Sequence, residues 1–231
     1  MYKGARVGVL IPALDEERAI ARVIGEIPEC VDDILVVDNG SRDRTAEVAE
    51  SAGARVVREG ERGYGAACQT GIKTLNGADI IVFVDGDYSD HPKEMLSLVD
   101  PIAAKEADFV VGSRVRGNAT SGSLTPQQRF GNWLACRLLR LFWGADFSDL
   151  GPFRAIRRDA LDSLGMTDRG YGWTVEMQIK SVKSGLRTME VPVSYRRRIG
   201  TSKISGTVRG SVVAGITILG WIFRSTLGPR N

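Results

Sequence analysis

The sequence is poor in the residues on which histidine-based and cysteine-based sites depend. Histidine occurs once, at His91, and the three cysteines, Cys30, Cys68 and Cys136, form no CxxC pair. This composition disfavours zinc centres and dithiol redox sites, and wide cysteine spacing is typical of free thiols in a reducing compartment. The single histidine stands beside Pro92 in an expected loop. It is therefore a poor candidate for a general base.

Long apolar runs are missing as well. The N-terminal apolar run is short and ends in a proline and acidic residues, unlike a signal peptide. The nearest candidate for a membrane span, 211–223, is shorter than the roughly 20 residues that a spanning helix needs. No GxGxxG follows the first expected strand, which argues against a dinucleotide-dependent dehydrogenase.

Charge is nearly balanced over the 231 residues, with 31 Lys and Arg against 28 Asp and Glu. This balance does not indicate nucleic-acid binding. The basic residues crowd into 114–140 and 187–209, so we expect an anionic partner on one side of the molecule. The sequence shows no repeat and no linker. With 43% apolar residues, a single domain over 1–231 is expected.

Apolar, β-branched runs alternate with segments of helical spacing through the first half of the chain. The runs lie at 6–11, 33–37, 55–58, 79–84 and 108–112. This rhythm predicts an α/β fold with a Rossmann-like, mostly parallel sheet flanked by helices and with ligands at the carboxyl ends of the strands. Farther on, apolar spacing predicts a helix at 126–143 and a C-terminal amphipathic helix at 207–224.

Two carboxylates follow the fourth expected strand directly, in Asp85-Gly86-Asp87. Mg²⁺ and Mn²⁺ take one or two carboxylates together with substrate phosphates, so this turn is a candidate metal and diphosphate site. A solvated turn would account for the same three residues.

Acidic residues also stand at the first and second strand ends. Asp38 begins a turn sequence and could accept a hydrogen bond from a ribose or a base. Glu16 stands where a helix begins, where the helix dipole favours acids, and could still contact a nucleoside. Each residue alone has a structural explanation, but their order and spacing together are more specific.

The chain resembles family 2 glycosyltransferases of the GT-A fold, close to dolichyl- or polyprenyl-phosphate mannosyl- and glucosyltransferases. The matching segments cover nearly the whole chain in family order: VLIPALDEE, ILVVDNGSRDRT, GYGAACQTGI, VFVDGDYSDHP, FVVGSR, SDLGPFRAIRRDAL, GWTVEMQIK and EVPVSYRRRIGTSKISG. The chain departs from the family pattern at Asp15, Asn39 and Ser89, where relatives usually carry Asn, Asp and Gln. The resemblance leaves open whether Ser89 or Asp90 completes the metal shell.

The resemblance implies an inverting transfer of a hexose from a GDP-mannose or UDP-glucose type of donor to polyprenyl phosphate. Residues 1–112 would bind the nucleotide sugar, and residues 113–231 would bind the acceptor. Asp85 and Asp87 would hold Mg²⁺ or Mn²⁺ and the diphosphate, with Asp87 acting in catalysis. The nucleoside pocket would be lined by Pro12, Leu14, Glu16 and Asp38.

Basic residues of the second half suit an anionic acceptor, because arginine forks match phosphate geometry. The resemblance implies that Arg114, in the GSR motif, and Arg129, at the start of the following helix, hold the lipid phosphate, with Arg114 also acting in catalysis. Arg198 and Lys203 lie on a basic, glycine-containing segment and are further candidates for the acceptor phosphate. A phosphate acceptor needs positioning more than a general base.

The helices expected at 126–143 and 207–224 combine apolar faces with arginines, a pattern of helices that lie in a membrane interface. We therefore expect a cytoplasmic protein that is peripheral on the inner face of the cell membrane. The alternative is that both helices pack on the sheet or form a homodimer contact.

Three other functions compete with this hypothesis. The acceptor could be a soluble or glycan hydroxyl. A sugar nucleotidyltransferase is disfavoured, because the acidic PALDEE segment after the first strand would repel a triphosphate. A non-catalytic nucleotide-binding module is the third alternative.

Overall fold

The computed structural model describes residues 1–200 and 208–227. Its strands are β1 (Val7–Ala13), β2 (Asp33–Asp38), β3 (Arg55–Arg58), β4 (Ile80–Phe83), β5 (Phe109–Ser113), β6 (Arg154–Arg157) and β7 (Thr188–Pro192). Its helices are α1 (Ile20–Gly25), α2 (Thr45–Ser51), α3 (Tyr64–Thr74), α4 (Met95–Ala103), α5 (Pro126–Trp143), α6 (Arg158–Leu164), α7 (Trp173–Lys183) and α8 (Val208–Leu227), with a 3₁₀ turn η1 at Pro92–Glu94. Each strand and helix that the residue pattern predicted lies within a few residues of its expected place.

The seven strands form one sheet in the order β3-β2-β1-β4-β6-β5-β7. Strands β1 to β4 are parallel, as are β5 and β7, whereas β6 runs antiparallel to both of its neighbours. The prediction of a mostly parallel α/β sheet is confirmed. Because β6 is reversed, its first residue, Arg154, lies at the same edge of the sheet as the carboxyl ends of β4 and β5.

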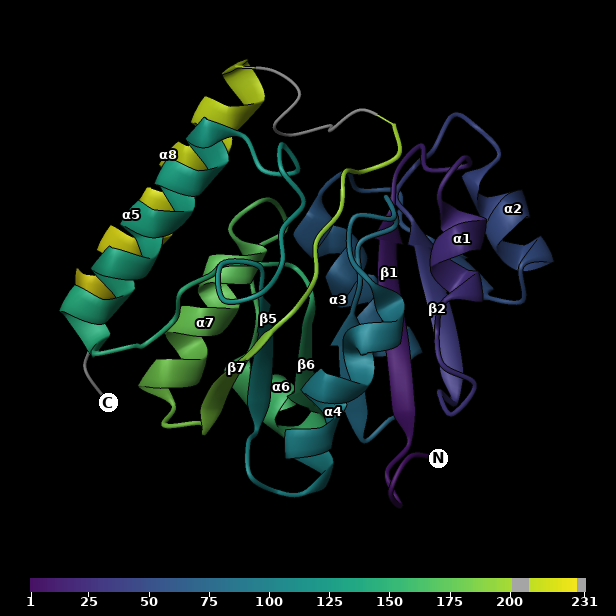
Figure 1. Cartoon of the computed structure of the whole chain (residues 1–231), viewed down its shortest axis with the longest axis horizontal. Helices are drawn as coiled ribbons and strands as arrows, with labels where there is room; N and C mark the ends of the chain where they lie inside the picture. The colour runs from purple at the N-terminus through teal and green to yellow at the C-terminus, as the bar shows by residue number, and fades with distance from the viewer. Residues whose placement is uncertain (201–207, 228–231) are drawn as a thin grey trace.

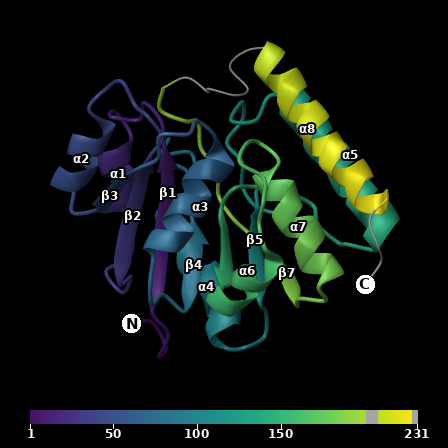
Figure 2. The same cartoon turned by 180° about the vertical axis from the view of Figure 1, so that it is seen from behind.

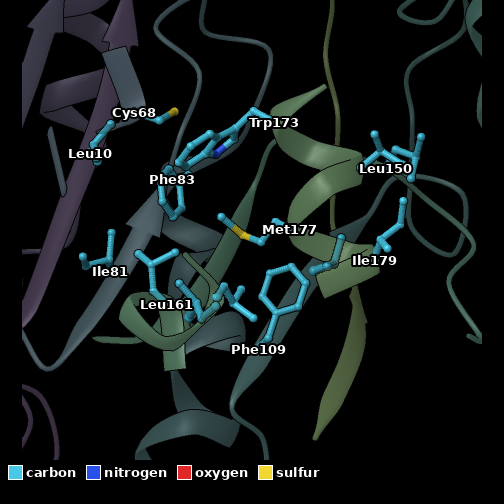
Figure 3. Close-up of a cluster of buried hydrophobic side chains, with 14 of the residues drawn as sticks. Leu10, Cys68, Ile81, Phe83, Phe109, Leu150, Leu161, Trp173, Met177 and Ile179 are labelled. Atoms are coloured by element: carbon cyan, nitrogen blue, oxygen red, sulfur yellow. The ribbon is translucent and has the colours of Figure 1, made fainter. Parts of the chain in front are cut away.

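Helices cover both faces of the sheet (Figures 1 and 2). One face packs against α1, α2 and α4, and the other against α3, α6 and α7, so that two separate apolar clusters form. On the second face, Trp173 of α7 packs against Phe83 of β4 with their ring centroids 6.4 Å apart. Figure 3 shows Trp173 and Met177 directed from α7 toward the strands. This packing places the beginning of α7 beside the carboxyl end of β4.

Helices α5 and α8 lie side by side at one end of the molecule, against α7 (Figures 1 and 2). A capping box starts α5, because Gln128 N donates to Thr125 Oγ1 at 3.2 Å and Thr125 N donates to Gln128 Oε1 at 2.8 Å. Gly144, with φ of 67°, ends the helix. No helix in residues 1–200 and 208–227 is long and apolar enough to traverse a bilayer.

The segment after β7 crosses the carboxyl ends of the central strands (Figure 1). Arg196 N donates to the carbonyl of Ser89, and Ile199 N donates to the carbonyl of Asp87, each at 2.9 Å. These bonds bring the basic segment onto the acidic turn after β4, more than 100 residues earlier in the chain.

The contact between α3 and the sheet predicts opposite effects for two glycine-to-alanine substitutions. A Cβ at Gly71 would lie 2.4 Å from Leu10 Cδ1 and 3.0 Å from Val37 Cγ2, whereas a Cβ at Gly220 of α8 would meet no atom within 4 Å. Gly71→Ala should lower the free energy of unfolding by about 1–2 kcal/mol, because overpacking outweighs the helix propensity of alanine. Gly220→Ala should raise it by about 0.5–1 kcal/mol. Urea denaturation measures both, and a stabilised Gly71→Ala would contradict the close packing of α3.

Candidate active site

Most of the predicted site residues line a single cleft. The cleft has a volume of about 1320 Å³ and opens at the carboxyl edge of the sheet. Its lining includes Pro12, Leu14, Glu16, Asp85, Asp87, Arg114, Arg129 and Arg198. Lys203 lies outside the described residues. The structure thus brings candidates from both halves of the sequence into one space.

Asp38, the predicted contact for a ribose or a base, ends β2 and is engaged within its own turn. Asp38 is 5% exposed, and its carboxylate accepts a hydrogen bond from Ser41 N at 3.1 Å. The next residue, Asn39, lines the cleft instead, and its side-chain oxygen accepts from Gly63 N at 2.8 Å. Asn39 also donates to the carbonyl of Glu61 at 2.7 Å. Asn39 therefore joins the β2 turn to the loop before α3, a role that its place in the turn sequence could have indicated.

The turn after β4 gathers three carboxylates, those of Asp85, Asp87 and Asp90. Burial, together with the neighbouring charge of Asp87, raises the pKa of Asp85 to about 7. Burial is also the main cause that raises the pKa of Asp90, and the charges of Asp85 and Asp87 raise it as well. Asp90 Oδ1 is buried without a hydrogen-bond partner, while Oδ2 accepts from Asp85 N at 3.3 Å. A cation bound at this turn would therefore favour the ionised forms of Asp85 and Asp90.

Arg198 supplies one such cation. Its Nη2 lies 2.9 Å from Asp87 Oδ2 and 3.2 Å from Glu16 Oε1. The side chain reaches these acids from the segment that follows β7, and it joins the tips of β1 and β4 through charge-assisted contacts. Arg198, predicted as a candidate for the acceptor phosphate, thus contacts Glu16 and Asp87, which were predicted for the donor.

The turn after β4 fits a metal that is shared with a phosphorylated ligand. Among the described residues, no group of three or more His, Cys, Asp or Glu side chains is arranged to hold a metal ion by itself. Mg²⁺ commonly uses only one or two carboxylates and completes its shell with waters and substrate phosphates. Asp85 and Asp87 both line the cleft and flank Gly86, so they offer this smaller set of oxygen ligands.

A buried ion pair organises the other wall. Arg114 follows β5 and binds Asp149 through two parallel hydrogen bonds, Nε to Oδ2 at 2.8 Å and Nη2 to Oδ1 at 2.7 Å. Burial alone would lower the pKa of Arg114, but Asp149 raises it well above its usual value. The guanidinium also lies 5.0 Å from the centre of the Tyr195 ring. Arg114 is therefore a fixed cation whose Nε and Nη2 are already engaged.

Arg154 holds the loop that carries Asp149. It is 1% exposed and donates to the carbonyls of Leu150, Gly151 and Thr174. Burial lowers its pKa to about 10, which still leaves it charged at neutral pH. Sequence reasoning missed both Asp149 and Arg154, although both lie in the segment SDLGPFR on which the resemblance partly rests.

The wall of the cleft that α5 and α8 form is cationic and apolar. It includes Arg129, Trp133, Arg137 and Arg140 of α5 and Ile218 of α8. Arg129, a predicted contact for the acceptor phosphate, is exposed on the first turn of α5 and lines the cleft. The cleft thus runs from the acidic sheet edge to the helix pair.

Comparisons with known proteins agree with this architecture. The model of the family described as Glycosyl transferase family 2 matches residues 8–165. An uncharacterized glycosyltransferase of Mycobacterium tuberculosis is 37% identical over 213 residues, 91% of this chain and 95% of that protein. The undecaprenyl-phosphate mannosyltransferase of Micrococcus luteus is 29% identical over 229 residues, 92% and 93% of the two chains. A solved structure of glucosyl-3-phosphoglycerate synthase from Mycobacterium tuberculosis, in complex with Mg²⁺ and uridine diphosphate, has a TM-score of 0.76 and 26% identity, covering 98% of this chain and 81% of that one.

The raised pKa of Asp85 predicts that Mn²⁺ binding depends on pH near neutrality. A metal needs the ionised carboxylate, so affinity should rise as the pH rises through the pKa of about 7. Between pH 6 and pH 8, in the absence of nucleotide, we expect about a tenfold gain in affinity. Electron paramagnetic resonance, which detects free Mn²⁺, measures the affinity at each pH. Asp85→Asn should bind weakly at both pH values, and a flat profile for the unsubstituted protein would contradict this assignment.

Proposed function

The chain belongs to glycosyl transferase family 2, and from this premise we propose that it transfers a hexose, with inversion, from a nucleoside diphosphate sugar to polyprenyl phosphate. Family membership and the GT-A fold were both predicted from the resemblance and are confirmed. The observation that carries the proposal is the cleft itself. Acidic groups stand at one end of it, and arginines with apolar side chains stand at the other.

The acidic end suits the donor. A bound Mg²⁺ or Mn²⁺ would act as a Lewis acid that neutralises the departing diphosphate. Asp85 and Asp87 would hold the metal, while Pro12, Leu14 and Asn39 would line the nucleoside pocket. A solved relative holds Mg²⁺ and uridine diphosphate, which supports a donor of this class.

The basic end suits a phosphate acceptor. An acceptor phosphate oxygen would form a bond to the anomeric carbon as the bond from that carbon to the diphosphate breaks, and the nucleoside diphosphate would leave with the electron pair. A phosphate is already anionic, so it needs positioning and no general base. In agreement, His91 is not among the described residues that line the cleft. The Micrococcus luteus relative, an undecaprenyl-phosphate mannosyltransferase, further supports this acceptor.

The surface of α5 supports an acceptor that resides in a membrane. Phe130, Trp133 and Leu141 are 62%, 56% and 74% exposed, and their spacing together with Arg137 places them along one side of the helix. The sequence of α5 contains arginines and no acidic residue. Such a surface suits the boundary between anionic headgroups and acyl chains.

Transfer to a short-chain polyprenyl phosphate tests the acceptor. With Mn²⁺ and either UDP-glucose or GDP-mannose, we expect a lipid-linked hexose, detected by mass spectrometry. Arg129→Gln should raise the KM for the acceptor about tenfold, because a charged hydrogen bond to phosphate is lost, and should leave the KM for the donor unchanged. Arg44→Gln, at an exposed arginine that precedes α2 and lies outside the cleft, is the matched control. Transfer only to soluble hydroxyl acceptors would instead favour the alternative family activity.

Flotation with liposomes tests the membrane surface separately. The protein should float with vesicles that contain anionic lipid and should float less well as salt is raised, because ionic attraction is screened. Phe130→Ser combined with Leu141→Ser should abolish flotation without changing nucleotide binding, since neither residue lines the cleft. Protein that remains in the soluble fraction at low salt would count against a membrane-resident acceptor.

A further inference from the structure

The loop 167–172, between α6 and α7, forms part of the cleft wall through Gly170 and Tyr171. Its beginning is anchored by Glu176 of α7, which is fully buried. The carboxylate of Glu176 accepts from Thr167 N at 2.8 Å, from Thr167 Oγ1 at 2.7 Å and from Asp168 N at 2.8 Å. These hydrogen bonds fix the beginning of the loop, which continues along the cleft wall.

The same loop sits directly on the start of α3. Ala66 N donates to the carbonyl of Arg169 at 3.0 Å, and Gly65 N donates to the carbonyl of Gly170 at 3.2 Å. A Cβ at Gly65 would lie 2.2 Å from the carbonyl oxygen of Asp168, so the two segments have no space between them. Tyr64, which begins α3, lines the cleft together with Asp85. Any movement of the loop would therefore reach the donor end of the cleft.

The C-terminal helix holds this loop from the other side. Trp221 Nε1 of α8 donates to Asp168 Oδ2 at 2.7 Å, while Asp168 Oδ1 accepts from Gly170 N at 2.8 Å. One carboxylate therefore joins the indole of α8 to the backbone of the cleft wall. A Cβ at Gly172 would lie 2.3 Å from Trp221 Cδ1, so the indole packs closely against the backbone at the end of the loop.

We infer that Trp221 is a positioning residue for the nucleotide sugar. Through the contact of Trp221 with Asp168, the position of α8 determines the shape of loop 167–172, which forms the cleft wall beside the donor. The inference rests on the proposed function, because it takes the cleft beside Asp85 as the donor site. Trp221 itself lies outside the cleft lining and acts through Asp168 and the backbone of Gly170. The position of α8 thereby also determines how well the donor is held.

Trp221→Phe removes the indole N–H and retains an aromatic ring. Isothermal titration with UDP and with GDP, each with Mn²⁺, should show dissociation constants about tenfold higher for the variant, the effect of losing a hydrogen bond to a charged group. The KM for the donor should rise with it, while kcat and the KM for the acceptor stay within about twofold of the unsubstituted values. Trp143→Phe in α5, which makes the same substitution outside the cleft lining, should leave these values unchanged.

Asp168→Asn provides a second variant, and the pair forms a double-mutant cycle. If both residues act through one contact, the double variant should bind the nucleotide no more weakly than the worse single variant. Hydrogen–deuterium exchange of the unsubstituted protein needs no variant. Adding Mn²⁺ and the nucleotide that binds should slow exchange in peptides covering 167–172 and in peptides of α8 that contain Trp221.

The outcomes separate the two proposals. The role of Trp221 would be overturned, and the proposed function left standing, by either of two results. One is a nucleotide affinity of Trp221→Phe within twofold of the unsubstituted protein, and the other is hydrogen–deuterium exchange in α8 that does not change when the nucleotide is added. Failure of the unsubstituted protein to bind either nucleotide with Mn²⁺ would overturn the proposed function itself, and the positioning role with it.

Discussion

The site depends on the balance of charge at the carboxyl edge of the sheet. Parallel strands β1 and β4 bring Glu16, Asp85 and Asp87 together, and burial makes the ionised forms costly. Arg198 offsets part of this repulsion with contacts of 2.9 and 3.2 Å. A metal and a diphosphate would add two positive charges and several negative ones at this place. The acidic end of the cleft therefore depends on the basic segment after β7 for its balance of charge.

Buried cations organise the wall of the cleft opposite these acids. Arg114 is held by Asp149, and Arg154 holds the loop around Asp149 by donating to three backbone carbonyls. Fixed charges of this kind need no rearrangement when an anion arrives, so they can attract and orient a phosphate at little cost in entropy. The exposed arginine Arg129 can move toward a ligand, whereas Arg114 presents only the part of its guanidinium that Asp149 leaves available.

Closely packed backbone segments connect the two ends of the cleft. Loop 167–172 contacts α3 on one side and α8 on the other, and glycines at 63, 65 and 172 permit these close approaches. Helices α5 and α8 stand at the periphery in Figure 1, but they pack on each other and on α7, and α8 reaches the cleft wall through Trp221. If the proposed function holds, α8 would support the wall beside the donor while α5 faces the acceptor.

Local sequence by itself determined the elements and the acidic turn. Strand runs, helical spacing and the terminal signals of α5 depend on neighbours within a few residues, so they could be predicted, as could Asp85 and Asp87 at the end of a buried strand. Only the tertiary structure decided that β6 lies reversed between β4 and β5, that Arg114 is engaged by Asp149, and that Asn39 replaces Asp38 in the cleft lining. It also decided that Arg198 meets Glu16 and that Trp221 meets Asp168. These pairs are far apart in the chain, and their contacts arise from how whole elements pack, which no local pattern of residues specifies.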